Sequence, residues 1–275
     1  MNRPCSRPHL QKETPVFASF RSELLRFRTT ARTGAIAMSA LAALVTIFAF
    51  TGVEPAQEGT RPAPGAATNA SSRLAEADGV LGGLILASSM IGIIALALSA
   101  LSVARDFELG TIRVLLVNQP NRLRFLAGKL AALAAVTIAA VTVAAIVAGV
   151  LGLALSGSTD IDTSAWSASA TVSTYANLTI GALLWGLFGA TIAVIARSAS
   201  TAITAGVAYF LVGENLLSLV WDNAGDWLPS GLLDTFISGG SPEVAYLTSA
   251  VLLASYAALA AATLSMVFAR RDITD

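Results

Sequence analysis

Six long apolar stretches, almost free of charge, dominate this sequence of 275 residues. A helix needs about 20 apolar residues to cross the hydrocarbon core of a bilayer, which is about 30 Å thick. Only 12% of the residues are charged, about half the fraction usual in a soluble domain. The sequence therefore predicts an all-α polytopic membrane protein with six transmembrane helices, over Gly34–Thr51, Gly79–Val103, Leu130–Leu155, Ser173–Ala196, Ser200–Val220 and Val244–Ala269.

The basic residues are distributed very unevenly between the segments that join these stretches. If the N-terminus is cytoplasmic, fifteen of the seventeen Lys and Arg residues lie inside, and only Arg61 and Arg73 lie outside. Cytoplasmic loops of membrane proteins carry such an excess of positive charge. We therefore predict that both the N-terminus and the C-terminus are cytoplasmic.

This topology divides the chain into a cytoplasmic tail over 1–33, a six-helix transmembrane domain over 34–269 and a second cytoplasmic tail over 270–275. In Val16–Thr33, four apolar side chains follow helical spacing on one arc, bordered by arginines: Phe17, Phe20, Leu24 and Phe27. Such a segment is typical of an amphipathic helix lying along the membrane interface. It could serve as a topology anchor only, or also contact a cytoplasmic partner.

The cytoplasmic loop between the second and third stretches has a distinct polar pattern. Gly110 interrupts the helix, Thr111–Val117 has the length of two helical turns, and Pro120 cannot continue the helical hydrogen bonds. Lys129 is then expected at the membrane surface. We expect a short, rigid, mixed-charge helix between two long membrane helices.

This loop resembles that of the permease subunits of type-2 ABC transporters. The matching residues are an acid, a Gly-Thr pair, an aliphatic and basic run, a proline, a basic residue and a lysine: Glu108, Gly110, Thr111, Ile112, Arg113, Leu115, Leu116, Pro120, Arg122 and Lys129. The ending Phe268–Ile273 is also similar to that family. The resemblance implies that the loop is a coupling helix docking into a separate ATPase subunit, through Glu108, Thr111 and Arg113.

The resemblance further implies a non-catalytic permease subunit of an exporter, paired with a second copy or a homologue. ATP with Mg²⁺ would be bound by the partner ATPase, because Gly128-Lys129 is followed by Leu130 and completes no phosphate-binding loop. The chain itself is expected to hold no cofactor and no metal, since its one histidine (His9) and one cysteine (Cys5) lie in the N-terminal tail. Its zero net charge gives no reason to expect nucleic acid binding.

Glu214, followed by Asn215, is the one charged residue inside a predicted span. It lies about 20 Å along its helix, nearer the external face. It could belong to a pathway or gate, accept a hydrogen bond between helices, or hold a cation. Near it, Leu228–Ile237 in the external stretch is expected to form a short helix that dips into the outer leaflet as an outer gate, or covers it.

A lipophilic or amphipathic cargo is favoured, because no other charge lies in the membrane. We expect a multi-pass protein of the plasma (inner) membrane of a bacterium. The alternatives are an ATP-independent channel and an accessory immunity or signalling membrane protein. An intramembrane enzyme would need paired polar groups within the helices, which the sequence does not offer.

Overall fold

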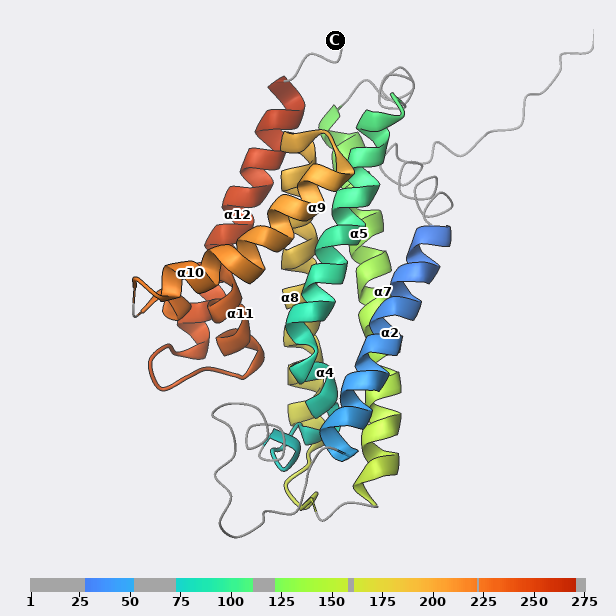
Figure 1. The fold of residues 1–275 in the computed structure, drawn as a ribbon, viewed down its shortest axis with the longest axis vertical. Coiled ribbons are helices and arrows are strands. Elements are labelled where there is room, and N and C mark those ends of the chain that lie inside the picture. Colours follow the sequence, from blue (N-terminus) through green and yellow to red (C-terminus); the bar gives the residue numbers. More distant parts are fainter. Residues whose placement is uncertain (1–27, 52–72, 111–121, 158–160, 222, 271–275) are drawn as a thin grey trace, which may run out of the picture.

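The computed structural model describes residues 28–51, 73–110, 122–157, 161–221 and 223–270, and these residues form helices and connections without a strand. The long helices are α2 (Arg28–Thr51), α5 (Ser88–Glu108), α7 (Arg122–Ser156), α8 (Ala168–Ala196) and α12 (Tyr246–Arg270). They form an elongated bundle (Figure 1). Shorter helices are α4 (Gly82–Leu86), α9 (Ala199–Ala208), α10 (Glu214–Ser218) and α11 (Pro229–Ile237).

Five helices in the described part of the chain are long and apolar enough to cross a membrane. These candidate spans are Arg32–Phe50, Ser88–Glu108, Arg122–Ser156, Ala168–Ala196 and Tyr246–Phe268. They correspond to five of the six predicted stretches, which confirms the helical, membrane-protein character of the chain.

The predicted sixth span, Ser200–Val220, is not confirmed. This stretch is divided into α9, a π-helical turn η2 (Tyr209–Gly213) and α10, and it runs obliquely across the bundle (Figure 1). A π turn holds one residue more than an α-helical turn and often marks a functional position. Within it, Phe210 packs on Trp185 of α8, with the ring centroids 3.8 Å apart.

The second predicted stretch is also interrupted. It begins with a 3₁₀ turn, η1 (Gly79–Leu81), continues as α4, and becomes α5 only after Ala87. At its start the backbone lies close to α2, because a Cβ on Gly83 would fall 2.2 Å from the Thr46 hydroxyl oxygen. The chain can make this approach only with glycine.

The bundle is held by two close helix pairs, α5 with α8 and α2 with α7. A Cβ on Gly189 of α8 would lie 2.2 Å from the Leu96 carbonyl oxygen of α5, so the two backbones touch at that point. Small residues allow such close packing between membrane helices. The buried apolar side chains form two main clusters along the bundle, one around Trp185 and Leu232 and one around Phe125 and Phe268.

Two predicted features lie outside the described residues. The interfacial helix over Val16–Thr33 overlaps the structure only at Arg28–Thr33, which belong to α2. The short helix over Thr111–Val117 falls wholly in the segment between α5 and α7 that is not described.

Candidate functional site

A buried ion pair joins the two helices that flank the 111–121 loop. Lys129 Nζ of α7 donates a hydrogen bond to Asp106 Oδ2 of α5, and both residues are 3% exposed. Lys129 lies about two turns into α7, and its side chain reaches α5, where Asp106 neutralises it. Its place at the membrane surface stays a prediction. Removing one partner of such a pair leaves an uncompensated buried charge, which is strongly unfavourable.

Glu108, at the last turn of α5, is bonded to a different part of the bundle. Its Oε1 accepts a hydrogen bond from the backbone N–H of Ala199 at 2.8 Å. Ala199 is the first residue of α9, and the side chain of the N-cap residue Ser198 makes no capping bond. Glu108 therefore supplies the acceptor and negative charge that a helix N-terminus favours.

The turn that leads into α9 is short. Arg197 ends α8 in the left-handed region, with φ of 58°, and its N–H donates to the Ala193 carbonyl oxygen at 2.8 Å. Ser198 is extended and α9 begins at once. Through Glu108, this turn is bonded to the end of α5.

Gly110 closes α5. Its φ of +64° lies in the left-handed region, and its N–H donates to the Phe107 carbonyl oxygen at 3.1 Å. Glycine is the usual residue at such a helix end. Of the other predicted coupling residues, Arg122 is the first residue of α7, whereas Thr111, Arg113 and Pro120 lie outside the described residues.

The end of α12 reaches the same end of the bundle. Phe268 lies between two rings, with its centroid 6.4 Å from that of Phe107 and 6.3 Å from that of Phe125. The C-terminal segment singled out by sequence thus begins against the helices that flank the 111–121 loop. The structure brings Asp106, Glu108, Lys129 and Phe268 to one end of the bundle.

Glu214 lies in a separate place, on α10, and is 5% exposed. Its Oε2 accepts hydrogen bonds from the backbone N–H of Ser230, at 3.1 Å, and from the Ser230 hydroxyl. Its Oε1 is buried without a hydrogen-bond partner in the described part of the chain. Asn215 does not join it, because that side chain is exposed and donates to the Leu211 carbonyl oxygen in the preceding π turn.

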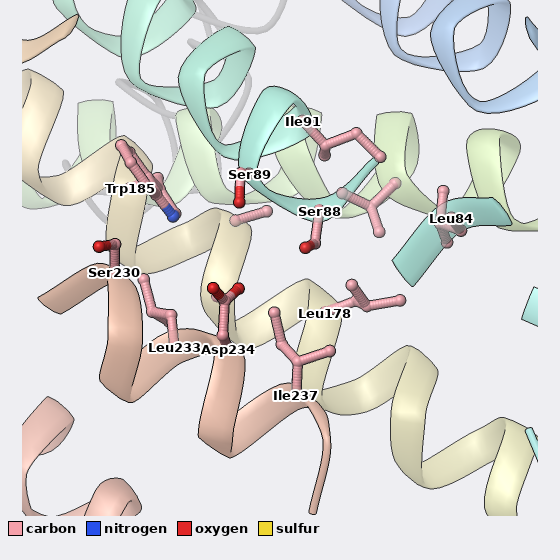
Figure 2. Close-up of a pocket in the computed structure, with 13 residues that line it drawn as sticks. Leu84, Ser88, Ser89, Ile91, Leu178, Trp185, Ser230, Leu233, Asp234 and Ile237 are labelled. Carbon is pink, nitrogen blue, oxygen red and sulfur yellow. The ribbon is translucent and has the colours of Figure 1, made fainter. Parts of the chain in front are cut away.

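Ser230 opens α11, the short helix that the sequence predicted over Leu228–Ile237. α11 packs against α8 and α12, and between α11, α8 and the start of α5 lies a pocket (Figure 2). The cavity is small, about 20 Å³, which is room for about one water molecule. Among the described residues that line it, none is basic, and most are apolar.

Asp234 supplies the only charge among the described lining residues. Figure 2 shows its carboxylate pointing across the pocket toward the side on which Ser88 and Ser89 lie. The sequence pattern alone did not single out Asp234. The spacing of Ser230 and Asp234, four residues apart in a predicted helix, places both on one face and could have revealed the site. No group of three or more His, Cys, Asp or Glu residues suited to a metal occurs in the described ranges.

Residues 68–274 match a family described as "Protein of unknown function (DUF2705)". The match runs from before α4 to the end of α12. It therefore includes the buried ion pair of Asp106 with Lys129 and the pocket beside α11. No curated protein matches the chain.

Proposed function

The chain belongs to the DUF2705 family, described as proteins of unknown function, and we propose that it is the permease subunit of an ABC transporter. A separate ATPase subunit binds ATP with Mg²⁺ and drives the export of a lipophilic or amphipathic compound. The proposal rests on the resemblance of residues 108–129 to type-2 ABC permeases. Two contacts next to this loop support the proposal: the ion pair of Asp106 with Lys129 and the hydrogen bond between Glu108 and Ala199.

The observation that carries the proposal is the way both flanks of the loop are fastened. Asp106 and Lys129 join α5 to α7, the helices before and after the loop. Glu108, also on α5, joins it to α9. A force applied to the loop is thereby delivered to α5, α7 and α9 together. Packed elements with defined contacts transmit such a displacement because they shift as units.

The path of that displacement leads from α9 toward Glu214. α9, the η2 turn and α10 are continuous in the chain, so a movement of α9 at Ala199 is passed to α10. There Glu214 is bonded to Ser230 at the start of α11. We propose that Glu214 belongs to the gate, with α11 as the element that it holds.

The remaining parts of the proposal concern topology and assembly. The oblique stretch 200–220 counts as the sixth crossing, both termini are cytoplasmic, and residues 16–33 form an interfacial helix. Two copies of the chain, or one copy and a homologue, enclose the path in the plasma (inner) membrane of a bacterium. The chain contributes no covalent chemistry of its own.

The test is the double variant Glu108→Ala with Arg113→Ala in the complex with its ATPase. We expect normal insertion and expression but ATP hydrolysis that no longer drives transport. Because Glu108 also caps α9, Ser198→Ala is the matched control: it alters the same helix start, removes only the exposed contact with the Ser200 hydroxyl and leaves the bond from Ala199 to Glu108 in place, and should stay coupled.

Two results would contradict the proposal. One is normal coupling in a well-expressed double variant. The other is purification of the chain from its host without any ATPase subunit while it still moves solute, which would favour the ATP-independent channel.

A further inference from the structure

A groove of about 200 Å³ lies where α5, α7 and α8 meet, apart from the pocket beside α11. In the described part of the chain, α5 and α7 each pack on α8 but only loosely on each other (Figure 1). The ion pair of Asp106 with Lys129 joins them at the end that carries the loop. An apolar cavity of about 150 Å³ accommodates benzene, so the groove has room for a single ring with short alkyl groups.

The walls of this groove are mainly hydrocarbon. Its described lining contains no charged residue, and the three helices that form it are candidate membrane spans. Burial of an unpaired charge against such walls is strongly unfavourable. Four leucines supply most of the apolar surface: Leu130, Leu133, Leu183 and Leu187. A ligand of this groove is therefore neutral and lipophilic.

Two buried hydroxyl side chains interrupt the hydrocarbon. Ser99 of α5 is 2% exposed and Thr137 of α7 is 5% exposed, and both line the groove. Neither hydroxyl makes a hydrogen bond with a described residue, and both oxygens are open to the groove. Gly186 of α8 leaves Ser99 accessible, because a Cβ there would lie 2.9 Å from the Ser99 hydroxyl oxygen. Since buried polar groups without a partner are unfavourable, these hydroxyls favour a ligand that forms hydrogen bonds.

We propose that this groove binds a small neutral alcohol or phenol taken from the bilayer, with its hydroxyl bonded to Ser99 and Thr137 and its hydrocarbon body against the four leucines. The acyl chain of a phospholipid would fill the apolar part but leave both hydroxyls without a partner. The lining begins at Leu130, directly after Lys129, so the ligand lies beside the pair that joins the loop flanks. That the ligand is the exported cargo rests on the proposed function; that it binds does not.

Binding is measured on the full-length chain, purified without an ATPase and reconstituted in phosphatidylcholine nanodiscs, with tritiated thymol. Empty nanodiscs give the amount that merely dissolves in the lipid. The competitor is p-cymene, which has the same skeleton without the hydroxyl. We expect saturable binding of thymol, and an affinity for p-cymene about fivefold lower, because p-cymene forms no hydrogen bond.

The two hydroxyls are tested by the double variant Ser99→Ala with Thr137→Val. It should lower the affinity for thymol about fivefold and leave that for p-cymene unchanged, because only hydrogen bonds are lost. Ser102→Ala is the matched control: Ser102 is also a buried serine of α5, at 4% exposure, but does not line the groove. It should bind both compounds as the wild type does.

A bulky residue locates the site. Ala134 lines the groove on α7, and Ala134→Phe should weaken both compounds at least tenfold without removing a hydroxyl. Ala139→Phe makes the same change at an exposed position of α7 outside the lining, and should leave binding unchanged. Thermal unfolding of each variant shows that it is folded.

The proposal is overturned if the wild type shows no saturable binding of thymol, if p-cymene binds as tightly, or if Ala134→Phe leaves binding intact. Unchanged thymol affinity in the double hydroxyl variant also overturns it, and would mean that bilayer hydrocarbon fills the groove. Thymol binding by a chain that has no ATPase partner would keep the site and remove the transporter. Coupled transport by a protein that does not bind thymol would do the reverse.

Discussion

Lys129 and Asp106 form a hydrogen-bonded ion pair between α7 and α5, with both residues almost fully buried. They are 23 positions apart in the sequence and stand on either side of the loop that resembles a coupling helix. The pair holds the two flanks of that loop at a fixed separation.

Removal of one charge of this pair should cost more stability than removal of both. Lys129→Met or Asp106→Asn removes the ion-pair partner of a buried charge and should lower the free energy of unfolding by about 3–5 kcal/mol. The double variant should recover most of that loss, because no charge remains. Thermal unfolding of the purified protein in detergent measures the three values. Equal losses in single and double variants would mean that the two charges do not compensate each other.

The bond between Glu214 and Ser230 should depend on an acceptor and not on the charge. Glu214→Ala leaves the Ser230 donors without a partner and should cost about 1–3 kcal/mol. Glu214→Gln keeps an oxygen that can accept, and should cost less. Asn215→Ala, next in sequence but exposed, should change stability little. The unfolding temperatures of these variants give the comparison, and an inert Glu214→Ala would show that the bond contributes nothing.

If Glu214 also acts in the gate, Glu214→Gln should separate the two roles. The variant would lose less stability than Glu214→Ala but would lose coupled transport. Full transport by a stable Glu214→Gln protein would assign the residue to inter-helix hydrogen bonding alone.

The contact of α5 with α8 should not tolerate a single added carbon. In Gly189→Ala the new Cβ meets a backbone oxygen at 2.2 Å, which the helices can relieve only by separating, at about 1–3 kcal/mol. Gly149→Ala in α7 is the matched control, since its nearest atom would be 3.9 Å away. This control should be neutral or gain up to about 1 kcal/mol from helix propensity. Thermal unfolding distinguishes them, and equal behaviour would contradict close contact.

The topology can be tested with single cysteines, because Cys5 is the only native one. In a Cys5→Ser background, Arg61→Cys should react with an impermeant maleimide in intact cells. Asn118→Cys should react only after permeabilisation. Thr274→Cys tests the sixth crossing, since an odd number of crossings would put the two termini on opposite sides. Labelling of Asn118→Cys in intact cells would remove the coupling loop from the cytoplasm.

Most of the helical architecture followed from apolar length alone, because a stretch of 20 or more apolar residues has few other stable forms in a bilayer. The break at Tyr209–Gly213 did not, since a π turn leaves the apolar pattern unchanged and the contact of Phe210 with Trp185 within it joins two different helices. The short helix after Leu228 was readable from its apolar spacing and Pro229, which favours a helix start.

The side-chain pairings could not be predicted from the sequence. The sequence predicts Lys129 as a charge near the end of a membrane helix. Only the packing of α5 against α7 shows that Asp106 is its partner. Glu108 was predicted as a surface contact, a prediction that stays open, but its bond to Ala199 depends on the neighbouring turn between α8 and α9. Asp234 was not predicted, because its place beside the pocket depends on the packing of α11 against α8.

The contact between Trp185 and Phe210 gives the molecule an intrinsic optical reporter. If the extra residue of the π turn is expelled to restore a regular helix, the residues beyond it rotate by about 100° around the axis. Phe210 would then leave the indole, and the emission of Trp185 would shift as its surroundings become more polar. With Trp166, Trp221 and Trp227 replaced by Phe, one natural fluorophore would follow the rearrangement in real time.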